Sequence, residues 1–174
     1  MDYDPEWTER FRELRDQLWP LVSDIALAIE HVGSTSVPGL AAKPIIDLTI
    51  VVSDRTRTSS VIDRIADAGY VHKGDQGVPG REAFDRPADT FPHHLYLCTR
   101  DNLGLRNHLA VRDQLMQDPE AVKVYSDLKR GLAKQYPHDI DSYVDGKTDF
   151  LAGLLERAGL SKQEIDEIRG VNEQ

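Results

Sequence analysis

Residues 29–52 read IEHVGSTSVPGLAAKPIIDLTIVV, and this stretch decides the fold. It predicts the end of one strand at residues 29–32, a glycine–serine turn at residues 33–36, and a second strand at residues 45–52. The second strand is apolar nearly throughout, and Asp47 is its one charge. Because a buried, unpaired carboxylate is costly, we expect Asp47 to have a partner, to bind a metal ion or to lie at an exposed strand end.

The turn before this strand has the chemistry of an anion site. Backbone N–H groups at Gly33 and Ser34 can face a phosphate, and the hydroxyls of Ser34 and Thr35 add donors. The alternative is a turn whose hydroxyls satisfy its own backbone. A phosphate cradle followed by a strand carboxylate indicates a nucleotide–metal site, in which Asp47 would bind Mg²⁺. The alternative for Asp47 is a structural carboxylate that is hydrogen-bonded to the turn.

The same residues carry a resemblance to a known family. A Gly-Ser turn followed by a strand with Asp47 is similar to the start of the polymerase-β-type nucleotidyltransferase pattern, which continues as Asp-x-Asp or Asp-x-Glu. More narrowly, HVGSTSVPGLAAKPIIDL at residues 31–48 resembles the signature of the GrpB family, a poorly characterised branch of that superfamily. The resemblance continues through five later segments, at residues 80–84, 93–97, 112–115, 119–129 and 143–147.

Length and composition limit the class of protein. We expect one domain over residues 1–174, with 40% apolar and 29% charged residues and a core that needs no disulfide. Cys98 is the single cysteine, which excludes an internal disulfide and a multi-cysteine zinc site. No apolar run approaches the roughly 20 residues of a membrane span, and the N-terminus has no signal-peptide pattern, so we expect a cytoplasmic protein without membrane contact. The net charge of −9 argues against non-specific nucleic-acid binding, but not against one nucleotide in a local positive pocket.

The order of predicted elements is that of an α+β fold. A helix begins at Asp4-Pro5, Pro20 kinks or divides it, and its second piece covers residues 21–28. A short helical turn is expected within residues 37–42. The remaining predictions are a helix at 56–69, strands at 70–72, 81–85 and 93–99, and helices at 102–117, from 118 to the break at 136, at 141–158 and at 162–169. The family resemblance implies a nucleotidyltransferase-like mixed β-sheet packed with helices, with a helical C-terminal part.

The strand residues depart from the superfamily pattern at one position. Two-metal phosphoryl transfer needs two carboxylates two residues apart on one strand, and here the second position is Thr49. One metal ion or none is therefore expected. The resemblance places a third carboxylate on the strand at residues 93–99, which offers His94, and Tyr96 where the GrpB pattern has histidine. His94 is a candidate metal ligand, general base or phosphate contact, and the alternative is a packed, hydrogen-bonded histidine.

Positive side chains for an anion come from several segments. Arg81 suits bidentate phosphate contact, and Lys43 is a second candidate, although it is also explained as a solvated lysine. Arg112, Lys129 and Lys147 match the family on C-terminal helices. Each lysine shares a helix face with a tyrosine four residues before it, so both are expected to line a cleft between helices and sheet.

Two functions follow from these residues. The first is a GrpB-family, nucleotidyltransferase-like enzyme that moves a nucleotidyl or phosphoryl group from a nucleoside triphosphate to an unknown acceptor. Gly33 and Ser34 would hold phosphate, Asp47 would bind Mg²⁺, and His94 would assist. The second is a catalytically inactive nucleotide- or anion-binding, or folding-assisting, module, which Thr49 favours. The related domain follows dephospho-CoA kinase in some bacteria, which implies an assisting role and admits a protein partner.

Overall fold

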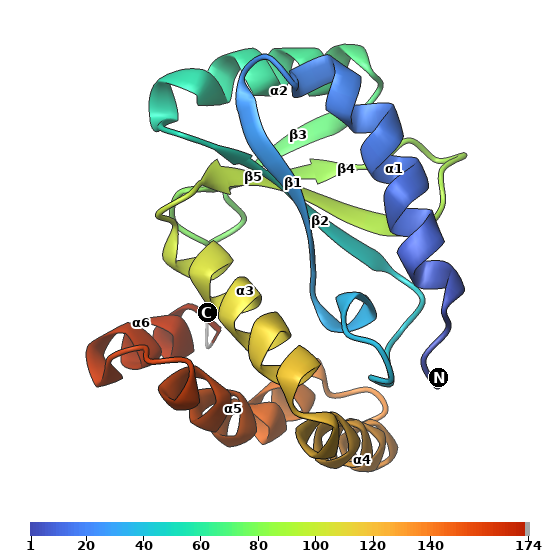
Figure 1. The fold of residues 1–174 in the computed structure, drawn as a ribbon, viewed down its shortest axis with the longest axis vertical. Helices are drawn as coiled ribbons and strands as arrows, with labels where there is room; N and C mark the ends of the chain where they lie inside the picture. The colour runs from blue at the N-terminus through green and yellow to red at the C-terminus, as the bar shows by residue number, and fades with distance from the viewer. Residues whose placement is uncertain (173–174) are drawn as a thin grey trace.

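The protein is built on a five-stranded mixed sheet, in a computed structural model that describes residues 1–172 (Figure 1). The sheet order is β1-β2-β5-β4-β3. Only β2 and β5 run parallel to each other, and the other neighbouring pairs within the described chain are antiparallel. The α+β prediction is therefore confirmed. The strands are β1 (Ala26–Val32), β2 (Ile46–Val52), β3 (Val71–Gly74), β4 (Arg81–Asp85) and β5 (His93–Thr99).

One face of the sheet packs on α1 (Glu6–Val22) and α2 (Thr58–Asp67). Alternate residues of β2 point to this face because side chains alternate along a strand. The result is the main hydrophobic core, in which these side chains are buried: Trp7, Leu14, Leu18, Ile46, Leu48, Ile50, Val52, Val61, Ile65, Leu95 and Leu97. The core fixes the register of β2, so Asp47 and Thr49 must point to the opposite face.

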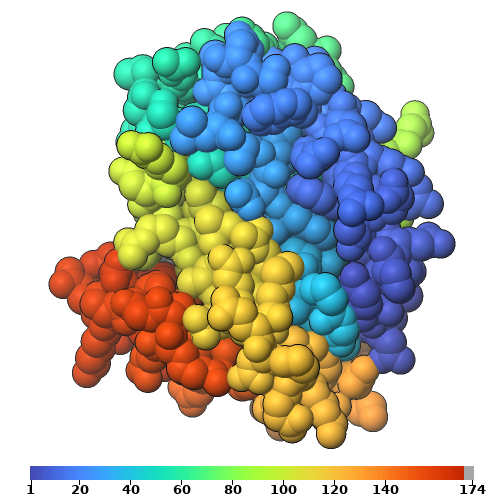
Figure 2. Space-filling view, viewed as in Figure 1, coloured from blue at the N-terminus to red at the C-terminus, as the bar shows by residue number. Residues whose placement is uncertain are grey.

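The C-terminal helices cover that opposite face and one end of the sheet. Figures 1 and 2 show them gathered on the side of the sheet away from α2. The first of them packs directly on the sheet through Leu105 and Leu109, which contact Val51 and Cys98. These helices are α3 (Leu103–Gln117), α4 (Pro119–Gln135), α5 (Ile140–Arg157) and α6 (Lys162–Asn172). None of the described helices has the length and apolar character needed to cross a membrane.

The structure corrects two predictions near the N-terminus. Helix α1 continues through Pro20 to Val22 without a division. Pro20 is exposed and lies in the last turn of α1. Proline has no N–H, so the carbonyl four residues earlier lacks its helical hydrogen bond and instead faces solvent. The predicted second helical piece at residues 21–28 is also wrong, because β1 begins at Ala26 and pairs with the end of β2.

The connection between β1 and β2 also differs from the prediction. Its helical turn is a 3-10 turn, η1 (Ser34–Ser36), and lies in the glycine–serine segment rather than at residues 37–42. The residues after this turn form no helix and pack against the C-terminal helices. Val37 and Leu40 are buried against α4 and α5, in a second hydrophobic cluster that includes Leu115 and Leu154. This cluster holds the turn against the C-terminal helices and so sets the distance between them.

Candidate functional site

Asp47 lies beside the turn that follows β1. Gly33 begins this turn with φ of +72° and ψ of −172°, a backbone conformation that is essentially restricted to glycine. A methyl group added to Gly33 would lie 2.3 Å from Oδ2 of Asp47, far inside van der Waals contact. The glycine therefore allows the backbone to approach the carboxylate closely, and Oδ2 faces the turn.

The other carboxylate oxygen of Asp47 pairs with His94. The two residues are opposite each other on the parallel strands β2 and β5, and Nδ1 of His94 lies 2.8 Å from Oδ1. A carboxylate only accepts, so Nδ1 carries a proton and donates it. This hydrogen bond raises the pKa of His94, against the opposing effect of desolvation. The side chain of His94 is 53% exposed, and its Nε2 forms no hydrogen bond within residues 1–172.

A second free carboxylate is not found next to Asp47. Thr49, the next residue of β2 on the same face, is buried. Its cross-strand neighbour is Glu30, but the carboxylate of Glu30 accepts a hydrogen bond of 2.8 Å from Nη1 of Arg112 on α3. In the part of the chain that the structure describes, no group of three or more His, Cys, Asp or Glu side chains could hold a metal ion. Asp47 is therefore the carboxylate available to a ligand at this point of the sheet.

A buried lysine of α4 reaches the glycine–serine turn from the other side. Nζ of Lys129 donates hydrogen bonds of 2.6 Å to Oγ of Ser34 and 2.6 Å to the carbonyl of Ala41. Burial and, to a smaller extent, the charge of Lys147 lower its pKa to about 8, against the opposing effect of Asp47. Lys129 has no ion pair among the described residues. A buried charge is normally paired with an opposite charge, whereas this ammonium group is held by two neutral oxygens.

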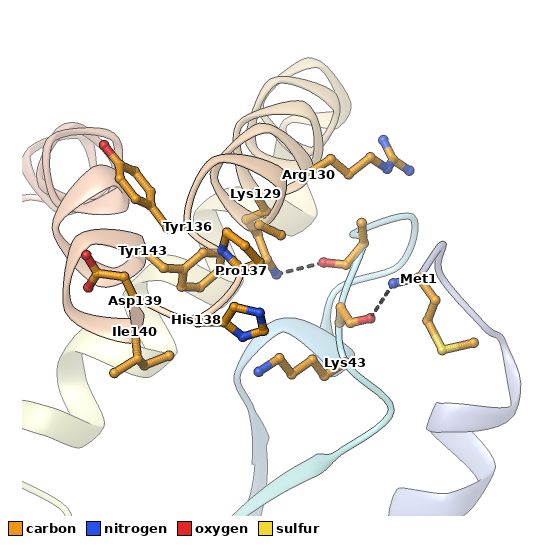
Figure 3. A pocket seen from close by; sticks show the side chains of 13 residues that line it. Met1, Lys43, Lys129, Arg130, Tyr136, Pro137, His138, Asp139, Ile140 and Tyr143 are labelled. Atoms are coloured by element: carbon orange, nitrogen blue, oxygen red, sulfur yellow. Dashed lines mark hydrogen bonds between the residues drawn. The ribbon is translucent and has the colours of Figure 1, made fainter.

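Other cations surround the same turn. Lys147 of α5 lies over the ring of Tyr143, with 4.4 Å from Nζ to the ring centroid, and burial followed by the charge of Lys43 lowers its pKa. Gly33, Ser34 and Lys147 share the lining of a cavity of about 330 Å³. A further hollow of about 350 Å³ lies on the other side of Lys129, and Figure 3 shows Lys43 and Lys129 facing it. An anion with several charges would therefore find cations in both directions from Ser34.

The remaining hydroxyls of the turn are used within the protein. Oγ1 of Thr35 donates to the carbonyl of Ile45 at 3.2 Å, so it accepts from Nε2–H of His31 at 3.1 Å. His31 stacks on Phe11, and burial lowers its pKa to about 4, which keeps it neutral. Oγ of Ser36 donates to the carbonyl of Gly33 at 2.6 Å. Ser34 is thus the hydroxyl of this turn that contacts a cation.

A larger cavity opens farther along the same face of the sheet. It has a volume of about 540 Å³ and lies between β5, the start of α3 and α6. The guanidinium carbon of Arg81 lies 4.4 Å from the ring centroid of Tyr96 in its wall. Asn107 and His108 of α3 line both this cavity and the 330 Å³ cavity. Burial lowers the pKa of His108, and Asp47 and Arg81 act on it in opposite directions, so it lies between two charged regions.

The residues predicted from sequence fall in several places. Gly33, Ser34, Asp47 and His94 come together at the ends of β1, β2 and β5, as the motif predicts. The lysine predicted on α5 lines the same cavity as the turn, whereas Lys43 is exposed at the neighbouring hollow, Arg81 lines the larger cavity and Thr35 is bonded inside the turn.

Sequence reasoning gave too little weight to two residues. Lys129 was predicted only as a family match that lines a cleft between helices and sheet, yet it makes the direct contact with Ser34. His108 was not considered at all. The signal for it was its helical spacing, because it lies three residues after Leu105 and four before Arg112 on one face of α3.

The geometry can be compared with known proteins. A family model described as GrpB protein matches residues 1–157. The chain belongs to the GrpB family. It is 35% identical over 156 residues to the UPF0157 protein YqkA of Bacillus subtilis, covering 90% of this chain but only 46% of that relative. It is also 35% identical over 163 residues to a UPF0157 protein of Streptomyces coelicolor, covering 93% of this chain and 84% of the relative.

Solved structures agree with the GrpB assignment. The crystal structure of the conserved protein GrpB from Enterococcus faecalis superposes with a TM-score of 0.79 and 33% identity, over 91% of this chain and 95% of that chain. Cid1, solved in complex with its short product ApU, superposes with a TM-score of 0.58 and 16% identity, over 84% of this chain and 49% of Cid1. The second likeness concerns the fold alone: this GrpB-family chain shares the fold of about half of Cid1.

Proposed function

We propose that this GrpB-family protein binds a nucleoside triphosphate at the glycine–serine turn and transfers a nucleotidyl or phosphoryl group from it to an acceptor hydroxyl. One observation carries the proposal. The buried ammonium of Lys129 is bonded to Ser34 and has no counter-ion within residues 1–172, and Gly33 of the same turn leaves no room for a side chain beside the carboxylate of Asp47. A phosphate group would supply the missing negative charge to Lys129, and Lys147 lines the same cavity as Ser34.

The pair formed by His94 and Asp47 supplies the acid–base chemistry. Because Nδ1–H of His94 is fixed on Asp47, Nε2 is the nitrogen that can take a proton from an attacking hydroxyl. The raised pKa of His94 makes it a better proton acceptor, and the carboxylate stabilises the imidazolium that results. The lysines around Ser34 would stabilise the negative charge on the transferred and departing phosphates.

The donor set also fits one Mg²⁺ ion, which is part of the proposal. Asp47 would hold it through Oδ2, the oxygen that faces the turn, while substrate phosphates and water supply the other ligands. When bound, the ion would neutralise phosphate charge and align the reacting oxygens. A second ion does not fit, because Thr49 is neutral and Glu30 is bonded to Arg112.

Thermal unfolding tests the proposal. We expect at least one of ATP, GTP, CTP and UTP with Mg²⁺ to raise the melting temperature, since a ligand at about 100 times its Kd stabilises by roughly 2.7 kcal/mol. The variant Asp47→Asn should lose the Mg²⁺-dependent part of the shift. Asp63→Asn, which changes an exposed acid on α2, is the matched control and should behave as the wild type.

Each outcome separates the two functions. If none of the four nucleotides changes the melting temperature, the proposed enzyme function is refuted. A nucleotide response that Asp47→Asn leaves intact would remove Asp47 from the site and favour a silent binding module. The chain is 27% identical to a dephospho-CoA kinase of Mycolicibacterium paratuberculosis and spans 44% of that protein. A binding module without catalytic activity, joined to an enzyme in this way, is the alternative function.

A further inference from the structure

We propose that the 540 Å³ cavity beside Arg81 is the acceptor site, and that its acceptor is a small hydroxyl-bearing organic anion with a carboxylate or phosphate group. This inference rests on the proposed function, because it names the second substrate of the same reaction. The cavity lies between Tyr96 on the sheet and Ile168 on α6, and it is separate from the cavity that Ser34 lines. The argument depends on its charge, its walls and its position relative to His94.

Arg81 has no ion-pair partner within the described chain. Its guanidinium group forms no salt bridge there, and its Nε is buried without any hydrogen-bond partner. The planar group is held against the ring of Tyr96, which fixes its orientation and leaves its edge for a ligand. Buried donors are normally satisfied, so an unsatisfied arginine in a cavity wall indicates an anionic ligand.

The other walls of the cavity are largely apolar. Val78, Pro79, Leu103 and Ile168 contribute aliphatic surface around the arginine. Cys98 also lines the cavity, and burial raises the pKa of its thiol to about 12, so it adds no charge. Glu167 of α6 also lines the cavity, where its carboxylate accepts a hydrogen bond from Gln163 of the same helix. A pocket with Arg81 held against the sheet and mostly aliphatic walls suits a molecule that combines one anionic group with a compact carbon framework.

Two residues that line the cavity, Tyr96 and Thr49, are strand neighbours of the reactive residues His94 and Asp47. Tyr96 follows His94 on the same face of β5, and the centroids of their rings are 6.2 Å apart. Tyr96 is also opposite Thr49, the neighbour of Asp47 on β2. A molecule anchored on Arg81 therefore extends along the sheet toward Nε2 of His94. His108, which lines both cavities, would then lie between acceptor and nucleotide.

The reaction balances with these two substrates. The acceptor hydroxyl oxygen forms a new bond to a phosphorus of the nucleoside triphosphate, and the bond from that phosphorus to the departing phosphate-bearing group breaks. The hydroxyl proton moves to Nε2 of His94, and the electron pair of the broken bond stays with the departing group. The anionic end of the acceptor, held by Arg81, takes no part in bond making.

Binding of simple anions to the protein without nucleotide tests this inference. The probes are 4-(hydroxymethyl)benzoate and glycerol 3-phosphate, which separate carboxylate from phosphate recognition, and 4-methylbenzyl alcohol is the uncharged analogue. Titration calorimetry or ligand-observed NMR at up to about 10 mM should detect at least one anion, but not the alcohol. The variant Arg81→Met keeps an aliphatic chain against Tyr96 and should weaken anion binding by at least about tenfold.

Two control variants complete the test. Arg100→Met removes an exposed arginine just after β5 and should bind the anions as the wild type does. Lys129→Met should weaken nucleotide binding but keep anion binding. Equal binding to wild type and Arg81→Met, or no binding of either anion to the wild type, would overturn the inference even when nucleotides still bind. In the wild type, normal anion binding without any nucleotide response would instead count against the proposed function.

Discussion

The absence of a side chain at Gly33 brings the turn against Asp47, and a single methyl group tests this contact. Gly33→Ala should cost about 1–3 kcal/mol of unfolding free energy, because its backbone conformation is strained for alanine and its Cβ meets Oδ2 of Asp47. It should also abolish the nucleotide-induced thermal shift. Denaturant titration and thermal unfolding with nucleotide measure the two effects.

Gly39 provides a matched control for this prediction. It also has a positive φ, of +82°, but an added Cβ would be 3.6 Å from Val122, an ordinary contact. Gly39→Ala should therefore lose about 1 kcal/mol of stability from backbone strain and keep its nucleotide response. Wild-type nucleotide affinity in Gly33→Ala would show that contact between turn and carboxylate does not shape the site.

Lys129 predicts how nucleotide affinity depends on pH. Its pKa of about 8 in the free protein should rise when a phosphate binds, so binding takes up a proton at higher pH. Affinity should then be constant below pH 8 and fall above it, by up to about tenfold per pH unit. Titration calorimetry from neutral to alkaline pH measures this. The charge of Lys147 lowers the pKa of Lys129 and that of Asp47 raises it. Neither charge removes the expected decrease in affinity at alkaline pH.

Substitutions within α4 identify the group that titrates. Lys129→Met should weaken binding at neutral pH and flatten the alkaline decrease. Lys134→Met removes an exposed lysine of the same helix and should leave both affinity and pH profile unchanged. An alkaline decrease that persists in Lys129→Met would assign it to another group.

At the scale of elements, two glycines of α5 should respond in opposite directions to alanine. A Cβ on Gly146 would lie 2.3 Å from Cδ2 of Leu132 on α4, so the glycine permits close packing of the two helices. Gly146→Ala should destabilise the protein by about 1–3 kcal/mol and weaken nucleotide binding, because it displaces the adjacent Lys147. Gly153 has open space around it, so Gly153→Ala should stabilise by up to about 1 kcal/mol. Denaturant unfolding of both variants checks the contrast, and equal stabilities would refute it.

The elements also show which features local sequence specifies. Strand β5 and helices α3 to α5 were predicted nearly to the residue, because alternation marks the strand and Asn102, Asp118 and Asp139 cap the helices. The start of β1 was missed, since Ala26 and its neighbours favour no strand by themselves. These residues form a strand because they pair with the end of β2.

The candidate site also combines features that local sequence specifies with features that depend on tertiary packing. The motif predicted Gly33, Ser34 and Asp47 as neighbours, and the family resemblance placed His94 on an adjacent strand. The contact between Lys129 and Ser34 joins residues 95 apart in the sequence and depends on how α4 packs on the turn. Neither periodicity nor spacing contains that information, so the buried ammonium group became evident only in three dimensions.

At the scale of the whole molecule, charge is distributed unevenly. The chain has a net charge of −9, yet Lys129, Lys147, Arg81 and Arg112 all line the space between the sheet and the C-terminal helices. A negative net charge discourages polyanions, whose length demands extended contact, whereas cations gathered at these cavities still accommodate small anions. This distribution is consistent with a nucleotide and a compact acceptor rather than with a nucleic-acid strand.

The outer wall of the Arg81 cavity has a consequence for the family. Glu167, Ile168 and Gly170 of α6 form that wall, whereas the family match ends at residue 157. The family match therefore covers the residues of the proposed nucleotide site but not the helix that closes the proposed acceptor cavity. Under the proposed function, we expect relatives that differ in this helix to differ in the acceptor that they bind.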